Sequence, residues 1–352
     1  MIERYFDNAA TTPVDPRVVE EMLPYFSEGF GNANSIHEPG QRARAAVELA
    51  RGRLGSLLEA EDSSQVFFTS GATEANNWIA QKSGGVICSP LEHTSMLEAI
   101  THSGGGVFQS RGHDVYPSTE CFGTASIMLV NNETGGIVDA TYYGRERKLH
   151  RDITQAIGKI SVDEHYDSAS LSAHKFYGPK GVGALHLRDY ELLEPLLFGG
   201  EHEYGLRAGT LNVPGIVGMG AAAAIALQEA DKNKRHAESL RALVLDEITK
   251  TSDIQLNSPA NSSPYIVSLS FLGVEGETLV VELDRAGYSI SSGAACSSRS
   301  TEPSHVLMAL GLPMEWIRGT IRISFGKYNT EEAAINLAKE LRKAVEKLRT
   351  MN

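Results

Sequence analysis

The stretch that decides the fold of this chain lies near its middle and reads Ser170-Leu171-Ser172-Ala173-His174-Lys175-Phe176-Tyr177-Gly178-Pro179-Lys180-Gly181. One lysine follows a serine and a histidine and precedes a turn rich in glycine and proline, as expected where a strand ends in a polar turn. A lysine in a crowded site loses its proton more readily, and its neutral amine forms Schiff bases with aldehydes. The Ser172 hydroxyl and the His174 ring are groups that bind phosphate. On its own the stretch fits two interpretations: an ordinary polar turn after a strand, or a turn that carries a phosphate-bearing aldehyde cofactor on Lys175.

The segments around this turn alternate between short apolar runs and helical patterns. Short buried strands are expected at residues 66–69, 86–88, 126–130 and 182–187. Apolar residues recur at helical spacing over residues 17–26, 41–58, 218–230 and 233–248. Because helical patterns separate several of the strands, the sequence predicts an α/β fold with a mostly parallel central sheet.

The character of the sequence changes after about residue 255. Strands are expected at residues 265–271 and 320–324, and helices at residues 276–286 and 330–348. This pattern predicts a large α/β domain over residues 1–255 and a smaller α+β domain over residues 256–352. We expect the N-terminal segment of the large domain to pack on the small one.

The composition is that of an ordinary globular protein. Of 352 residues, 41% are hydrophobic and 22% are charged, which is enough for a large core and two domains. The net charge of −12 argues against direct binding to nucleic acid or to anionic membranes. The sequence shows no signal peptide and no apolar run of bilayer length. Cys88, Cys121 and Cys296 are spaced for neither disulfides nor a metal site, so we expect no metal and a reducing cytoplasm.

Three motifs place polar groups directly after expected strands. Ser70-Gly71-Ala72-Thr73 leads from a strand into a helix, whose first backbone N–H groups form an anion site. His93 follows the next strand, where its ring is suited to stack on a flat ligand or to move protons. Asn132 follows the third strand, so its side chain is expected in a cleft at the carboxyl ends of the strands.

Four further features carry chemistry. Asp152 lies close to Gln155, and a carboxylate beside a pyridinium nitrogen keeps that nitrogen protonated, which makes the ring an electron sink. The glycine-rich segment 199–210 is typical of a binding loop. Cys296 lies among small residues, where an accessible thiolate acts as a nucleophile. Arg322, inside an expected strand, is suited to bind a carboxylate with two hydrogen bonds.

Taken together, these motifs resemble the cysteine desulfurases of the NifS/IscS type, which are pyridoxal 5′-phosphate (PLP) proteins of aminotransferase-like, type I fold. The resemblance runs from Tyr5-Phe6-Asp7-Asn8-Ala9-Ala10-Thr11-Thr12 to Phe325-Gly326, almost the whole chain. Ser-Gly-Ala-Thr-Glu, Asn-Asn-Glu-Thr-Gly, Ser-Ala-His-Lys-Phe-Tyr-Gly-Pro-Lys-Gly and Arg-Ala-Gly-Thr-Leu-Asn follow one another in the family's order. The segment 291–298 resembles the group with a long mobile cysteine loop.

The resemblance implies a role for each matching position. Lys175 would carry PLP as a Schiff base, and the phosphate would be bound by Ala72, Thr73, Ser172 and His174. Thr210 would reach the phosphate of the neighbouring subunit, which implies a homodimer. The ring would be held by Asp152 at its nitrogen, by Gln155 and Asn132 at its oxygen and by His93, which stacks and moves protons. The substrate carboxylate would bind Arg322, with Asn132 and Asn32.

The chemistry that the resemblance implies removes sulfur from L-cysteine. Lys175 would take the α-proton, and the Cys296 thiolate would attack the substrate sulfur, leaving a persulfide on Cys296 and releasing alanine. A mobile loop would carry this sulfur to an acceptor protein for iron–sulfur cluster assembly or thiolation. Two other readings stay open: a selenocysteine lyase or other class V PLP enzyme, and a catalytically silent scaffold in a sulfur-transfer complex.

The chain departs from the family pattern in a few places. The stretch from Asn132 to Asp152 is roughly five residues short for its loop, so the helix usual there is expected to be truncated or missing. Arg151 stands where the family usually has a small apolar residue, and Glu201 and Tyr204 replace an expected Gly and Arg. These departures affect the outer surface and the choice of partner, and they leave the PLP residues intact.

Overall fold

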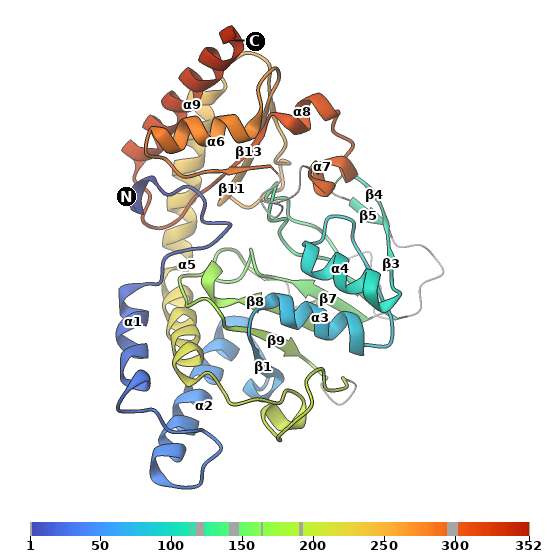
Figure 1. The fold of residues 1–352 in the computed structure, drawn as a ribbon, viewed down its shortest axis with the longest axis vertical. Coiled ribbons are helices and arrows are strands. Elements are labelled where there is room, and N and C mark those ends of the chain that lie inside the picture. Colours follow the sequence, from blue (N-terminus) through green and yellow to red (C-terminus); the bar gives the residue numbers. More distant parts are fainter. Residues whose placement is uncertain are drawn as a thin grey trace.

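A computed structural model describes residues 2–112, 114–116, 123–140, 148–162, 165–189, 193–293 and 302–351 (Figure 1). Its largest sheet has seven strands, in the order β1 (Val66–Thr69), β9 (Gly183–Leu187), β8 (Ser168–Ser172), β7 (Lys148–Asp152), β6 (Thr124–Ser126), β2 (Val86–Cys88) and β3 (Gly106–Val107). Strand β9 is antiparallel to both of its neighbours, and the other four pairs are parallel. The expected mostly parallel sheet is confirmed.

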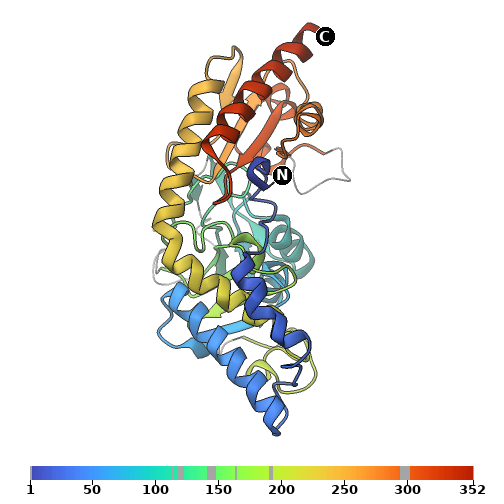
Figure 2. The same ribbon diagram turned by 90° about the vertical axis from the view of Figure 1, so that its left-hand side faces the viewer.

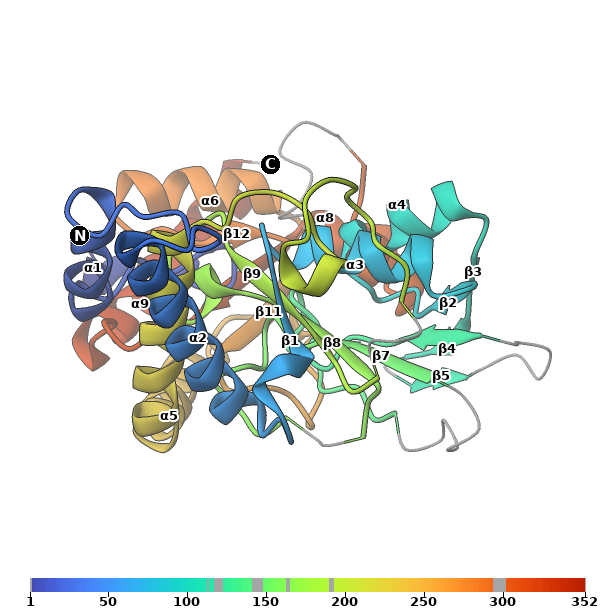
Figure 3. The ribbon, with the colours of Figure 1, turned by 90° about the horizontal axis from the view of Figure 1, so that it is seen from below.

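Helices cover both faces of this sheet, because alternate residues of each strand point to opposite sides. On one face Val66, Phe68 and Ala184 pack with α2 (Glu38–Leu58) and the first half of α5 (Val213–Ile248). On the other face Phe67 and Leu185 pack with α3 (Ala72–Lys82) and α4 (Thr94–Ser103). Figure 3 shows the strands between these two helical layers. The short α1 (Pro16–Met22) lies against α5.

A second sheet of four antiparallel strands forms the upper part of the molecule in Figure 1. Its order is β10 (Ile254–Leu256), β11 (Ile266–Phe271), β13 (Thr320–Ser324) and β12 (Ser291–Ser292). The helices of this part are α6 (Gly276–Arg285), α7 (His305–Ala309), α8 (Met314–Arg318) and α9 (Glu331–Met351). A boundary at residue 255 would fall inside β10, and the division into two domains there stays a prediction.

Helix α5 is one continuous helix of 36 residues, where the sequence pattern predicted two. Its second half contributes Ala237, Leu240, Val244 and Ile248 to the core of the second sheet, so the helix connects both hydrophobic cores. Figure 2 shows it rising past the first sheet to lie beside α9. By length and composition α5 is apolar enough to cross a membrane, but 61% of its most apolar window is buried in the protein, as in a core helix.

The N-terminal segment lies along the second sheet. After the 3₁₀-helix η1 (Ile2–Arg4), Tyr5 pairs with Ser289 and Asp7 pairs with Ser324. The Phe6 ring is fully buried and contacts the rings of Tyr288 and Phe325. This pairing leaves the next residues, Ala9 and Ala10, facing the first sheet.

Three local expectations were wrong. The strand expected at residues 126–130 is β6, Thr124–Ser126. Beyond it the amides of Ile127 and Leu129 still donate to β7, but the Leu129 carbonyl accepts from Val138, so the regular ladder ends. Strands β7 and β8 had not been expected, because both contain many polar residues.

The remaining short elements are η2 (Leu23–Phe26), η3 (Ser63–Gln65), η4 (Ala173–Lys175), η5 (Glu203–Gly205) and the ribbon of β4 (Gln109–Arg111) and β5 (Asp114–Tyr116).

Candidate active site

A cavity of about 290 Å³ opens at the carboxyl ends of β7 and β8, between the two sheets. The ends of parallel strands are the usual ligand site of such sheets. The cavity is lined by Ala9, Ala10, Ala72, Thr73, His93, Ser95, Met128, Asn132, Asp152, Thr154, Gln155, Ser172, His174, Lys175 and Arg322. Ten of these residues had been singled out from the sequence. They come from segments far apart along the chain, and the fold brings them to one place.

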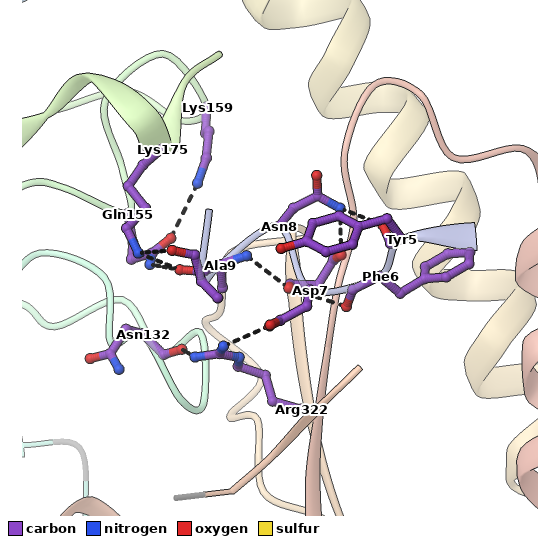
Figure 4. A network of polar contacts seen from close by, with 12 residues as sticks. Tyr5, Phe6, Asp7, Asn8, Ala9, Asn132, Gln155, Lys159, Lys175 and Arg322 are labelled. Atoms are coloured by element: carbon purple, nitrogen blue, oxygen red, sulfur yellow. Dashed lines mark hydrogen bonds and ion pairs between the residues drawn. The ribbon is translucent and has the colours of Figure 1, made fainter. Parts of the chain in front are cut away.

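Lys175 ends the short η4 that follows β8, and its amine points to the N-terminal segment. Its Nζ donates to the carbonyl oxygens of Ala9 at 2.6 Å and Ala10 at 2.8 Å (Figure 4). These two carbonyl oxygens hold the Lys175 amine at the cavity. Lys175 is thus a primary amine fixed at the wall of a small cavity, as a Schiff-base lysine requires.

Asp152 ends β7, and its carboxylate is held by a buried polar network. One oxygen accepts from the Thr154 amide at 2.9 Å, and the other accepts from Asn76 Nδ2 at 3.0 Å. Asn76 is fully buried, donates also to Ser95 Oγ at 2.9 Å and accepts at Oδ1 from the Ser170 hydroxyl and, at 3.2 Å, from His150 Nε2. Burial lowers the pKa of His150 to about 4, so its ring is neutral at pH 7.

The turn between β1 and α3 forms one end of the cavity. The Ala72 amide at the start of α3 donates to Ser172 Oγ at 2.7 Å. Gly183 allows this close packing, since a Cβ there would lie 2.5 Å from the Gly71 Cα. The nearby His174 shares a hydrogen bond of 3.0 Å with Thr11 Oγ1, and its pKa is lowered to about 4, first by burial and then by Lys175. Neutral donors and a helix N-terminus therefore gather here, as in many phosphate sites.

His93 caps the N-terminus of α4. Its Nδ1 accepts from the Ser95 amide at 3.1 Å and lies 2.9 Å from Ser95 Oγ. Because Nδ1 accepts from a backbone N–H, the neutral ring carries its proton on Nε2. Burial lowers the pKa of His93, and the Asp152 carboxylate opposes this shift. At neutral pH the uncharged ring therefore offers an N–H as a hydrogen-bond donor.

Gln155 stands behind the lysine. Its Nε2 donates to the Ala9 carbonyl at 2.8 Å, and its Oε1 accepts from Lys159 Nζ at 3.2 Å. Gln155 and Lys175 therefore share the Ala9 oxygen as an acceptor (Figure 4).

Arg322, in the middle of β13, reaches the cavity from the second sheet. Its Nη1 donates to the Asn132 carbonyl and its Nη2 to Asp7 Oδ1, both at 2.8 Å. The Arg322 side chain is 3% exposed, yet within the described part of the chain its Nε has no hydrogen-bond partner, and neither has the buried Oδ1 of Asn132. Buried polar atoms without partners are rare in native proteins, so these two indicate a place for a ligand.

Comparison with known proteins was made on this basis. The family model of the class-V aminotransferases matches residues 4–105 and 118–337. The chain belongs to the class-V aminotransferase family. It is 38% identical to "Cysteine desulfurase IscS 1" of Archaeoglobus fulgidus, over 99% of this chain and 98% of that protein. It is 40% identical to "Cysteine desulfurase IscS" of Vibrio vulnificus, over 99% and 94%.

Solved structures of class-V aminotransferase relatives agree with the computed fold. A "NifS-like protein" has a TM-score of 0.87 and 35% identity, covering 98% of this chain and 99% of that one. DndA from Streptomyces lividans has a TM-score of 0.75 and 34% identity, covering 92% and 99%. The alignment with the Archaeoglobus protein has 382 positions against 352 residues here, so at least 30 positions have no counterpart in this chain. That some of these positions fall between Asn132 and Asp152, as the sequence predicts, stays a prediction.

Class-V aminotransferases of the cysteine desulfurase type are PLP enzymes, and this cavity fits that cofactor. It offers an amine on Lys175 for the aldehyde and a buried carboxylate on Asp152 for the pyridine nitrogen. Ala72 and Ser172 offer a donor cluster for the phosphate, together with His174. The donor set matches each polar end of PLP.

Two predicted residues of the site, Asn32 and Thr210, do not line the cavity, and a third, Cys296, is not among the described residues. Asn32 is exposed, and its Oδ1 accepts from the Asn34 amide; its contact with substrate stays a prediction. Thr210 is also exposed, on the glycine-rich loop, and its expected partner is the neighbouring subunit. Cys296 lies outside the described residues.

Several residues that complete the site were missed from the sequence. Asn76, Ser95 and Lys159 lie in helices or turns next to known motifs, and their only signal was a polar residue within an otherwise apolar segment. Asp7 precedes the first motif and carries no signal beyond its place in the family pattern.

Proposed function

We propose that this chain is a PLP-dependent cysteine desulfurase, which converts L-cysteine to L-alanine and holds the sulfur as a persulfide on Cys296. The observation that carries the proposal is that Lys175 and Arg322 line one small cavity, Lys175 from the first sheet and Arg322 from the second. Asp152, at the end of β7, lines the same cavity. An amine for a cofactor aldehyde and a guanidinium for a carboxylate suit an α-amino acid substrate. The full-length relatives named cysteine desulfurase support this assignment.

Each residue then has a defined task. When bound, PLP supplies an electron sink that makes the substrate α-proton acidic. Arg322 binds the substrate carboxylate, which gives its Nε–H an acceptor. The Lys175 amine takes the α-proton, and Asp152 keeps a proton on the pyridine nitrogen. The Nε2–H of His93 would donate a hydrogen bond beside the ring.

The sulfur step falls to Cys296. Its thiolate forms a bond to the substrate sulfur as the bond between that sulfur and Cβ breaks, and the electron pair of the broken bond stays on carbon. Protonation of Cβ then gives alanine, and the sulfur remains on Cys296. A transaminase of the same class needs no such thiol, so Cys296 favours the desulfurase over that alternative.

We infer that the protein is a homodimer in which Thr210 contacts the phosphate bound by the other subunit. Large apolar side chains stand exposed on the segment after α1 and near the glycine-rich loop, including Phe30 at 75%, Ile36 at 88% and Phe198 at 82%. Exposed apolar groups of this kind mark interaction surfaces. A monomer in light scattering would contradict this inference.

We propose that the sulfur acceptor is a protein of iron–sulfur cluster assembly or of thiolation, and that the enzyme acts in the cytoplasm. The structural neighbours include "SspA in complex with cysteine" and DndA, whose names describe those proteins. A silent scaffold is disfavoured because Lys175, Asp152 and His93 all line the cavity.

The test is the intact mass of the PLP-loaded protein after incubation with L-cysteine without reductant, together with an assay for alanine. We expect a gain of one sulfur that maps to Cys296, with alanine formed. Bound PLP without persulfide or alanine would contradict desulfurase chemistry, and a protein that binds no PLP would favour the silent scaffold. Borohydride trapping gives the control: the PLP adduct should map to Lys175 and be lost in Lys175→Ala, and an adduct on another lysine would overturn the site.

A further inference from the structure

Lys159 is a buried lysine that the reaction described above does not use. Its side chain lies one layer behind the cavity wall, and the residue is 7% exposed. Burial, with help from the charges of Lys175 and Arg322, lowers the pKa of Lys159 to about 7. A buried ammonium or amine group without a hydrogen-bond partner is unfavourable, so the hydrogen bond that Lys159 makes stabilises it in this position.

The hydrogen bond of Lys159 runs to Gln155. Its Nζ donates to Gln155 Oε1 at 3.2 Å (Figure 4). The same Nζ lies 6.0 Å from the centroid of the Tyr265 ring. The two residues are four positions apart in a tight turn, where the Lys159 amide donates to the Ala156 carbonyl. Gly158 has a φ of +69° in this turn, a conformation that favours glycine.

The bonds on Gln155 leave only one orientation for its amide. The Nε2 end donates to the Ala9 carbonyl at 2.8 Å, and the Oε1 end faces the Lys159 donors. A lysine Nζ has donors only, whether charged or neutral, so a flipped amide would place donor against donor at one end. It would also place oxygen against oxygen at Ala9. The remaining N–H of Gln155 is therefore free to face the cavity.

We propose that Lys159 is a positioning residue that fixes the amide of Gln155, so that its N–H is presented to the ring oxygen of PLP. This inference rests on the proposed role of Gln155 in the proposed function. Lys159 acts through Gln155 and not on the cofactor itself, since it does not line the cavity. Both protonation states of Lys159 serve, because an amine donates as well as an ammonium does.

A double-mutant cycle on PLP affinity tests this route of action. Apoenzymes of the wild type, Lys159→Met, Gln155→Ala and the double variant are titrated with PLP, and its absorbance and protein fluorescence are followed. We expect Lys159→Met to weaken PLP binding roughly two- to tenfold, the worth of one hydrogen bond, and to shift the absorbance band of the bound cofactor. On the Gln155→Ala background the same change should have no further effect.

Two controls separate positioning from a general effect on the fold. Lys148→Met, at an exposed lysine that begins β7, removes the same charge and should leave PLP affinity unchanged. The urea midpoint of the Lys159→Met apoenzyme should not fall, because methionine suits a buried site better than a lone charge does. If Lys159→Met does not fold, Lys159→Gln, which keeps a donor, is put through the same cycle and should retain most of the affinity.

Two results would overturn the inference. One is wild-type PLP affinity and absorbance in Lys159→Met, and the other is an equal loss on both Gln155 backgrounds. Either result would leave the proposed function intact, provided that the wild-type adduct still maps to Lys175. Failure of that adduct in the wild type would reject the proposed function itself.

Discussion

Replacing Arg322 by methionine separates two roles that the structure gives to its guanidinium. The group is 3% exposed and donates to Asp7 and to the Asn132 carbonyl, each at 2.8 Å. Two charge-assisted hydrogen bonds to a substrate carboxylate contribute about 3–5 kcal/mol. At about 1.4 kcal/mol per tenfold, Arg322→Met should weaken L-cysteine binding roughly 100- to 4,000-fold. It also leaves the Asp7 carboxylate, 17% exposed, without its counter-ion, which costs about 3 kcal/mol of stability.

The double variant Asp7→Asn/Arg322→Met tells these effects apart. Removing both charges should restore much of the urea midpoint of the apoenzyme, since no unpaired buried charge remains. It should not restore L-cysteine binding, measured by the absorbance change of bound PLP. Cysteamine, which has the amine and thiol of cysteine without the carboxylate, should bind the wild type and both variants alike. Equal loss of cysteamine and L-cysteine, or recovery of L-cysteine binding in the double variant, would refute the assignment of Arg322 to the substrate carboxylate.

Three further outcomes are expected. Cys296→Ala should keep bound PLP and its response to L-cysteine but form no persulfide by intact mass, and full sulfur release by this variant would reject Cys296 as the acceptor. Lowering the pH from about 6.5 should destabilise the apoenzyme in urea by up to roughly 1.4 kcal/mol per pH unit for each of His150 and His174. The pKa of each is lowered to about 4 in the fold, so the unfolded chain binds protons first; a flat profile would contradict this. Arg51→Met should lower the free energy of unfolding, measured by urea titration, by about 3 kcal/mol, because it removes the positive charge that pairs with the buried Glu203 carboxylate at 2.8 Å. Glu203→Gln on that background should recover part of this loss.

The parts of the site that could be predicted from sequence are those set by short segments. A strand that runs into a helix places Ala72 at a helix start, and the turn after β8 places Lys175 and His174 together. Parallel strands bring their carboxyl ends to one edge, so residues that follow different strands meet there. This rule was enough to group His93 and Asn132 with the lysine.

Strands β7 and β8 show why the pattern of apolar residues was not enough for the rest. Their buried side chains include His150 and Asp152 on one strand and Ser168 and Ser170 on the other. His150 Nδ1 lies 2.9 Å from Ser168 Oγ, so a polar pair occupies a buried position between neighbouring strands. Periodicity assigns such residues to solvent, because it does not register a hydrogen bond that forms only when the strands meet.

The N-terminal segment was expected to pack on the small domain, but the individual contacts that it makes in the site were not predicted, because they lie at the other end of the chain. The Ser324 amide donates to the Phe6 carbonyl at 2.7 Å, and the Ala9 amide donates to Ser324 Oγ at 2.8 Å. This pairing fixes Asp7 beside Arg322 and aims the Ala9 carbonyl at Lys175 (Figure 4). One short segment thus holds the groups proposed for substrate and for cofactor. The cavity is therefore complete only after both sheets have formed and this segment has paired with β13, and no local pattern in the sequence can anticipate a contact of that range.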